Sequence, residues 1–206
     1  DLSDPTNPRI VGELHIPGFS SYLHPVGDDH LLAVGMDADE EGRIRGVQIQ
    51  VFDVSDFTAP RLAHKHVITT GDWSSWSEAL WDHHAFTFHN GRLSIPIYKY
   101  ERDGDDWRYF SGLGVFDIDV EEGIKEVGFI DHSDLAARQR CPYADDEYEG
   151  DYNYCDDYYA YNWYASMRRS LYIEDNLFSL SHVGLKVSSL DDPGAEIASI
   201  LLVPER

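Results

Sequence analysis

Val51-Phe52-Asp53-Val54-Ser55-Asp56 (VFDVSD, residues 51–56) joins an apolar run to a turn rich in Asp and Ser. A short run of apolar and β-branched residues predicts a β-strand, and Asp and Ser favour the turn that ends it. The same order of residues occurs at positions 1–5 (DLSDP), 115–119 (VFDID) and 187–193 (VSSLDDP). Each copy is followed by a second apolar stretch: PRIVGELHI, PRLAHKHVI, IKEVGFI or AEIASILLV. This self-similarity indicates that the chain is built from a structural repeat.

A pair of apolar runs separated by a turn precedes each later copy of the motif. The turns are residues 27–29, Asn90-Gly91 and residues 174–176. Asn-Gly is the strongest two-residue signal for a β-hairpin, because both residues tolerate positive φ. Each repeat therefore predicts four short antiparallel strands. A short helix is expected only within residues 131–140, with Ser133 or Asp134 as its cap.

Four short strands per repeat, with the third ending in an Asp/Ser-rich turn, is the pattern of a β-propeller blade. Successive copies, counted at Asp1, Asp53, Asp117 and Ser189, are 52, 64 and 72 residues apart, which exceeds the usual blade of about 40–50 residues. We assign the excess to three insertions, at residues 37–45, 99–109 and 131–164. The sequence thus predicts an all-β chain that forms about three four-stranded blades of a larger propeller, with long acidic loop insertions.

The predicted blades divide the chain as parts of one propeller domain. Residues 1–18 are expected to be the outer strand of a preceding blade, and the blades themselves to span residues 19–70, 71–132 and 133–206. The last blade contains an acidic insert at residues 141–155. Because a closed propeller has about 4 to 8 blades, we expect the remaining blades to come from the same chain or from the other part of a nicked chain.

The charge of the chain is strongly negative. It contains 38 acidic and 16 basic residues, for a net charge of −22. This charge repels phosphate backbones and anionic lipids, so nucleic-acid and membrane-surface partners are disfavoured. It also suits a salt-loving source, the alternative being an ordinary acidic secreted protein. No apolar run approaches the ~18 residues of a membrane span. Any export signal is expected to be removed or to lie upstream of Asp1.

Two cysteines, Cys141 and Cys155, bracket the stretch CPYADDEYEGDYNYC. A disulfide between them would close a loop of about 15 residues and stabilise the fold by about 3 kcal/mol. It would also place the protein in an oxidising compartment. Two buried thiols are the alternative.

The same insert contains acidic residues at every second position: Asp145, Glu147, Glu149 and Asp151. An extended chain presents such residues on one side, where their oxygens would suit calcium. The alternative is a solvated acidic loop. Eight tyrosines in and after the insert, together with Trp163, make this region a candidate contact surface for a protein or a glycan.

Asp82-His83-His84 is the strongest candidate for site chemistry. If it begins an innermost strand, Asp82 and His84 point to one side and His83 to the other. Equivalent positions in the other repeats are Tyr22 or His24 and Arg169, so these side chains are expected to meet around the propeller axis.

The functional interpretation of this group is a cation site made by His24, Asp82 and His84, with Glu78 in addition. Imidazole and carboxylate ligands suit zinc, copper, iron or manganese. The alternative is that these side chains only hydrogen-bond the backbones of neighbouring blades. Arg169 and Tyr22 are the accompanying binding residues, and Arg168 and Arg169 are expected to form ion pairs with nearby carboxylates.

Four phrases in the chain resemble one known family: DLSDPTNPRIVGELHIPGFSSYLHPVGDDHLLAVG, FDVSDFTAPRL, SEALWDHHAF and NLFSLSHVGLKV. They are similar to secreted bacterial and archaeal proteins with a C-terminal β-propeller domain, distantly related to WD-type repeats. The resemblance implies a propeller in an exported or cell-surface protein. It implies no catalytic residues.

The sequence therefore favours a binding or scaffold module outside the cytoplasm, with a protein or glycan partner and with calcium or a transition metal as its only expected cofactor. No Gly-x-Ser-x-Gly elbow, phosphate-binding glycine loop or Cys-x-x-Cys motif is present. The alternative is a metal-dependent or carboxylate-using hydrolase or lyase with its site on the propeller axis.

Overall fold

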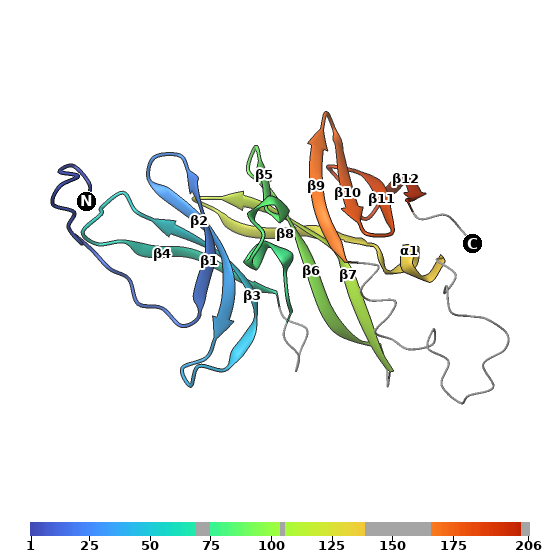
Figure 1. Cartoon of the computed structure of the whole chain (residues 1–206), viewed down its shortest axis with the longest axis horizontal. Helices are drawn as coiled ribbons and strands as arrows, with labels where there is room; N and C mark the ends of the chain where they lie inside the picture. Colours follow the sequence, from blue (N-terminus) through green and yellow to red (C-terminus); the bar gives the residue numbers. More distant parts are fainter. Residues whose placement is uncertain (69–74, 104–105, 139–165, 203–206) are drawn as a thin grey trace. The chain divides into compact units, whose positions relative to one another are not determined.

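The computed structural model describes residues 1–68, 75–103, 106–138 and 166–202. Their strands form three four-stranded antiparallel sheets, each with its strands in chain order (Figure 1). The first sheet contains β1 (Phe19–Val26), β2 (His30–Ala38), β3 (Ile44–Asp53) and β4 (Arg61–Ile68). The second contains β5 (Thr87–His89), β6 (Arg92–Asp103), β7 (Asp106–Asp119) and β8 (Gly123–Asp131). The third contains β9 (Met167–Ile173), β10 (Asn176–Ser181), β11 (Gly184–Ser189) and β12 (Glu196–Leu201). The predicted all-β fold with four strands per repeat is confirmed.

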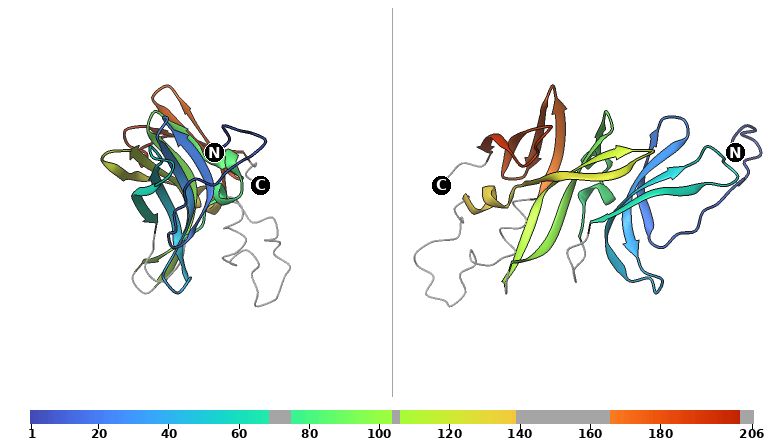
Figure 2. Two further views of the ribbon diagram at one scale, coloured as in Figure 1. Left: turned by 90° about the vertical axis from the view of Figure 1, so that its left-hand side faces the viewer. Right: turned by 180° about the vertical axis from the view of Figure 1, so that it is seen from behind.

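The chain divides into two compact units. The first comprises residues 1–74 and 118–124, and the second comprises residues 75–117 and 125–206. The β1–β4 sheet belongs to the first unit, whereas the second and third sheets belong to the second unit, apart from the tip of the β7–β8 hairpin. Figure 2 shows the sheets from two further directions.

The β1–β4 sheet follows from the alternation of side chains along its strands. In the β2–β3 pairing, Val34 lies opposite Ile49, and its neighbours on the same face are also large and apolar. All of these side chains are buried: Leu32, Val34, Met36, Val47, Ile49 and Val51. Burying each one contributes about 1.5–3 kcal/mol. The central strands β2 and β3 therefore supply the core of the first unit.

The β5–β6 turn has the conformation that the sequence predicted. Asn90 and Gly91 both have positive φ, at 49° and 78°. This is the combination required by the tight turn that matches the twist of two antiparallel strands. Arg92 pairs with His89 directly after the turn, so Asn90-Gly91 also sets the register of the hairpin.

Within the second unit, the β5–β8 sheet packs on the β9–β12 sheet. Their shared apolar core contains Leu113, Val115, Ile130, Met167 and Leu177. Two polar contacts join the same sheets: Tyr98 Oη donates to the Met167 carbonyl at 2.9 Å, and the hydroxyls of Ser94 and Ser170 are 2.8 Å apart. Packing between consecutive four-stranded sheets is what the propeller prediction requires.

A buried histidine, His132, also links these two sheets. It follows β8 directly, and its Nδ1 and Nε2 lie 3.0 Å and 2.8 Å from the hydroxyls of Ser181 and Ser179 on β10. Burial, followed by the positive charge of Lys186, lowers the pKa of His132 to about 3. The side chain is therefore neutral at physiological pH, and its two nitrogens serve as structural hydrogen-bonding groups.

The three insertions share one position in the sheet topology. Each sheet has two ends. At the insertion end, the first strand begins, a loop connects the second strand to the third, and the fourth strand ends. We call the opposite end the turn end. Residues 37–45 and 99–109 form second-to-third strand connections, and residues 131–164 leave a fourth strand and return to a first. The described parts of all three therefore begin at the insertion ends of their own sheets.

The insertions differ in detail from the loops that the sequence suggested. Residues 99–109 lengthen the β6–β7 hairpin, because Cα pairing continues through Tyr100 and Tyr109 to the end of both strands. The predicted helix is present as α1 (Ser133–Arg138). At its start, the carboxylate of Asp131 accepts the N–H of Ser133 at 2.8 Å. Residues 1–18 form no strand with any described residue, so their assignment to a preceding blade stays a prediction.

Candidate functional site

The stretch SEALWDHHAF forms two single turns of 3-10 helix before β5, namely η1 (Glu78–Leu80) and η2 (His83–Ala85). Ser77 caps η1 by accepting the N–H of Ala79 at 3.1 Å. Asp82 caps η2 by accepting the N–H of His84 at 3.0 Å. Short polar side chains favour such caps because they satisfy backbone N–H groups at a helix start.

The prediction that Asp82-His83-His84 begins a strand is therefore wrong. The cap of Asp82 turns the backbone, and the inference that His83 and His84 point to opposite sides fails with it. The two imidazole rings have centroids 4.0 Å apart. One ligand atom from each of Asp82, His83 and His84 lies within 4.8 Å of the others. An Asp side chain often accepts the backbone N–H of the residue two positions later. This tendency of Asp82 could have revealed the turn in the sequence.

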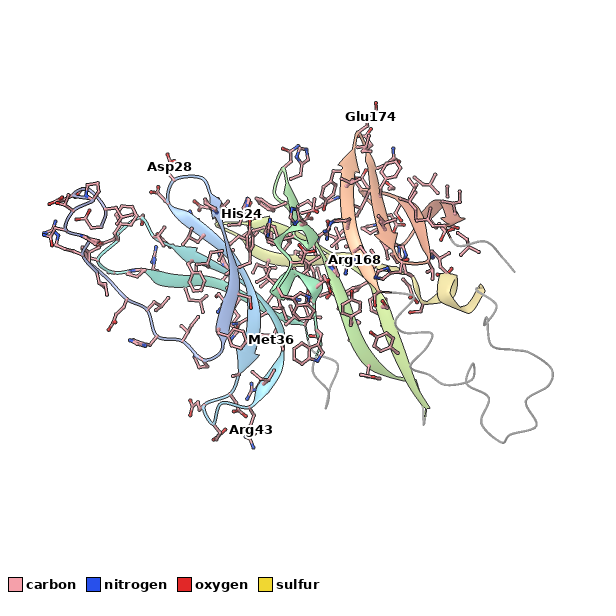
Figure 3. All side chains as sticks on the ribbon, in the orientation of Figure 1. His24, Asp28, Met36, Arg43, Arg168 and Glu174 are labelled. Atoms are coloured by element: carbon pink, nitrogen blue, oxygen red, sulfur yellow. The ribbon has the colours of Figure 1, made fainter. Side chains whose placement is uncertain are left out.

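Two consecutive arginines on β9 contact these turns. Leu180 pairs with Arg169 and Ser181 pairs with Met167, which leaves Arg168 as the extra residue of a β-bulge. A bulge redirects side chains that would otherwise alternate. Arg168, which is labelled in Figure 3, donates through Nη1 to Glu78 Oε1 at 2.8 Å. Arg169 Nη1 donates to Asp82 Oδ2 at 3.0 Å. The structure thus brings Arg169 to Asp82, and both arginines form ion pairs.

We call Glu78, Asp82, His84, Arg168 and Arg169 the polar cluster. The N–H of His84, and then Arg169 and the His84 ring, lower the pKa of Asp82 to about 2, against the opposing effect of burial. Asp82 is therefore ionised at every physiological pH. A carboxylate of this kind can hold a cation or an arginine, but it is a poor general acid near neutral pH.

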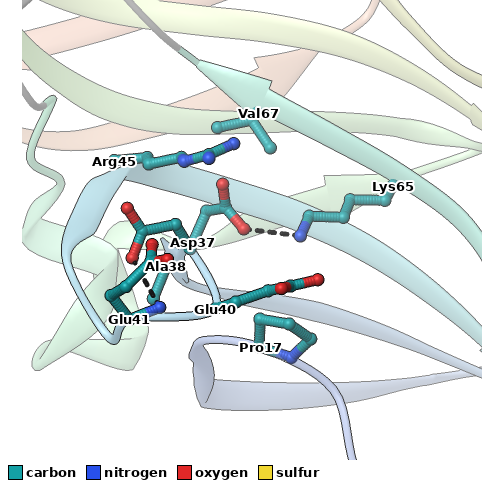
Figure 4. A pocket seen from close by; sticks show the side chains of 9 residues that line it. Pro17, Asp37, Ala38, Glu40, Glu41, Arg45, Lys65 and Val67 are labelled. Atoms are coloured by element: carbon teal, nitrogen blue, oxygen red, sulfur yellow. Dashed lines mark hydrogen bonds and ion pairs between the residues drawn. The ribbon is translucent and has the colours of Figure 1, made fainter.

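A second polar feature, a pocket of about 550 Å³, lies at the insertion end of the β1–β4 sheet (Figure 4). It is lined by Pro17, Asp37, Ala38, Asp39, Glu40, Glu41, Arg45, Lys65 and Val67. Lys65 Nζ lies 2.5 Å from Oδ1 of the buried Asp37. Asp39 is paired with Arg43, whose backbone and side-chain hydrogen bonds lower the pKa of Asp39. The local sequence predicts only an insertion here, because the lysine that completes the pocket comes from β4.

Comparison with known proteins agrees with this architecture. A family described as a beta propeller domain matches residues 1–193. The chain belongs to the beta propeller domain family.

Two relatives of this propeller are uncharacterized archaeal proteins. One, from Archaeoglobus fulgidus, is 46% identical over 86 residues, and the other, from Methanocaldococcus jannaschii, is 41% identical over 86 residues. Each alignment covers 42% of this chain and 12% of the relative. The propeller therefore spans a small part of the length of these relatives.

The remaining site residues predicted from the sequence lie either in the first unit or outside the described part of the chain. Tyr22 and His24 lie on β1 in the first unit, where Tyr22 Oη is 3.4 Å from His24 Nδ1. A joint site of His24 with the polar cluster of the second unit stays a prediction. Further proposed residues lie outside the described part of the chain: Cys141, Asp145, Glu147, Glu149, Asp151, Cys155 and Trp163. Among the described helices, none has the length and hydropathy of a bilayer-spanning segment.

Proposed function

We propose that this propeller is a binding and scaffold module that acts outside the cytoplasm and recognises a protein or glycan partner at the insertion ends of its sheets. The observation that supports this most is the polar cluster, in which two adjacent arginines are held by two carboxylates from a neighbouring connection. In repeat proteins the longer connections gather on one face, which is often the binding face. Here the polar cluster and the described parts of the insertions, residues 37–45, 99–103, 106–109 and 131–138, each lie at the insertion end of their own sheet.

The polar cluster has the properties of a recognition surface. Arg168 and Arg169 keep 39% and 36% of their side-chain surface exposed while their carboxylate partners hold them in place. A guanidinium fixed in this way can still donate to a carboxylate or hydroxyl of a partner. Charged groups arranged in advance give specificity more than affinity. The constant charge of Asp82 supports binding better than it supports acid–base catalysis.

The outward face of the β9–β12 sheet supports a scaffold role. Leu171, Phe178 and Val187 pair across three strands of this face, and none of them is buried; Leu171 is 58% exposed. The opposite face, with Ser170, Ser179 and other small residues, is the one that contacts the β5–β8 sheet. We propose that a further blade covers the apolar face, repeating the packing of the second sheet on the third.

The binding proposal can be tested with swapped ion pairs. In a Glu78→Arg/Arg168→Glu variant the ion pair is conserved but its charges are exchanged, so the fold should persist while the surface pattern is inverted. The matched control exchanges Arg92 and Asp117, which are paired at 2.8 Å at the turn end of the β5–β8 sheet. The labelled full-length protein is applied to its native cells, either untreated or treated with protease or with periodate.

We expect the Glu78/Arg168 exchange to abolish retention on cells and the Arg92/Asp117 exchange to leave it intact. Loss of retention after protease treatment would identify a protein partner, and loss after periodate treatment would identify a glycan. Equal retention of both exchanged variants would refute recognition at the insertion end. Recovery of the native protein only in the cytoplasmic fraction would refute its location.

A further inference from the structure

We infer that Asp82, His83 and His84 bind a divalent transition-metal ion. Each residue supplies one ligand atom, and the three atoms lie within 4.8 Å of one another. Two imidazole nitrogens and one carboxylate oxygen suit zinc, nickel or copper, whereas calcium takes six to eight oxygen ligands. This inference goes beyond the proposed function, since metal binding is measured on the chain without its partner.

The backbone holds the three ligands in one turn. The N–H of Ala85 donates to the Asp82 carbonyl at 3.0 Å, and the N–H of Phe86 donates to the His83 carbonyl at 3.2 Å. Ala85 is fully buried and Phe86 is 9% exposed, so the base of the turn is anchored in the protein. Both histidine side chains remain exposed. The turn is therefore organised before metal arrives, which reduces the conformational cost of binding.

The ligand set differs from the one expected from the sequence. His83 joins Asp82 and His84 because the turn brings one ligand atom of each within 4.8 Å of the others. Glu78 is paired with Arg168 at 2.8 Å in the neighbouring turn, and His24 lies in the first unit. Three protein ligands leave at least one coordination position for water or for a group of a bound partner. The site would then be an open one, unlike the closed four-ligand sites that stabilise small domains.

Arg169 is the competitor of the metal. Its guanidinium donates a hydrogen bond to Asp82 Oδ2 at 3.0 Å, and Asp82 Oδ1 lies 3.1 Å from His84 Nδ1. A cation bound at Asp82 has to displace or share these contacts and is repelled by the positive charge of Arg169. Removing this charge should tighten metal binding, whereas loss of a residue that only orients the site would weaken it.

The test is titration of the purified chain with Co²⁺, followed by its visible absorption, and with Zn²⁺, followed by calorimetry. We expect His83→Ala, His84→Ala and Asp82→Asn each to weaken binding by about 10-fold or more, and Arg169→Gln to tighten it severalfold. Asn retains the capping ability of Asp82, so this variant should keep the turn. The control is His15→Ala, because His15 is an exposed histidine paired with Glu13 at 3.2 Å in the first unit.

Two outcomes would overturn the inference, and a third would overturn the competitor role of Arg169. Wild-type affinity in His83→Ala would remove the three-residue site. Equal weakening in His15→Ala would show non-specific adsorption of cations to a chain of net charge −22. Weaker binding in Arg169→Gln would show that the arginine supports the ligands and does not compete. None of these measurements involves the partner, so the proposed function can fail or succeed independently.

Discussion

The stability of the second unit between pH 7 and pH 5 should depend on the protonation of a buried residue, His132. Its side chain is fully buried between the β5–β8 and β9–β12 sheets and bonded to Ser179 and Ser181. Burial is the largest cause of its lowered pKa, Lys186 adds to it, and the carboxylates of Asp134 and Glu196 oppose it. In the folded state the pKa is about 3, against an ordinary value of 6.5. The unfolded chain therefore takes up this proton first as the pH falls.

The size of the effect follows from the two pKa values. Above pH 6.5 His132 is neutral in both states, so its contribution to stability is complete there. Between pH 6.5 and about pH 3, each decrease of one pH unit lowers the free energy of unfolding by about 1.4 kcal/mol. From pH 7 to pH 5 the expected loss is about 2 kcal/mol. Carboxylates with lowered pKa, such as Asp82, add their losses mainly below this window.

The assay is urea denaturation of the wild type and of His132→Gln at pH 7 and at pH 5. The variant should be less stable at pH 7 by about 1–3 kcal/mol, because Gln cannot reproduce both hydrogen bonds of the imidazole. Its loss between pH 7 and pH 5 should be smaller than that of the wild type by about 2 kcal/mol. His89→Gln removes an exposed histidine and should keep the wild-type pH dependence. The same pH dependence in wild type and His132→Gln would refute the reasoning.

Three further predictions concern packing and turns, each measured as a change in the free energy of unfolding. Leu113→Ala, in the core between the second and third sheets, should lower it by about 2–5 kcal/mol; a loss below 1 kcal/mol would contradict this core. Gly91→Ala should lower it by about 1 kcal/mol, because φ is 78° at this position. In the control Gly128→Ala the loss should be much smaller, because no atom lies within 4 Å of the added Cβ. Leu171→Ala should change it by less than about 0.5 kcal/mol in this chain but by about 2–4 kcal/mol in a longer protein that supplies a further blade. Equal effects of Leu171→Ala in both proteins would mean that no blade covers this face.

Much of the fold was predictable because its signals are local. The Asn90-Gly91 turn depends on two residues that tolerate positive φ, and each strand depends on the alternation or clustering of apolar side chains over a few positions. The repeated order of these signals also predicts four strands per blade. The error at Asp82-His83-His84 was local too, since a capping carboxylate can end an extended conformation within two residues.

The candidate site was predictable only in part. The sequence singled out Asp82, His84 and Arg169, but it assigned no site role to His83, because the strand assumption separated it from His84. Arg168 was expected to form an ion pair but was given no place in the site, because the bulge that redirects its side chain depends on the pairing of β9 with β10. The pocket at Asp37 was missed because Lys65 lies on a different strand, 28 residues further along the chain.

The sequence alone therefore determined the repeat, the strands, the tight turns and the negative charge of this protein, because these properties depend on residues close together in the chain. The tertiary structure alone decided which distant side chains meet: Arg168 with Glu78, 90 residues away, and His132 with the serines of β10. Such pairs form when two sheets bury their apolar faces against each other. The packing then fixes, to within a hydrogen-bond length, polar groups that no local pattern relates.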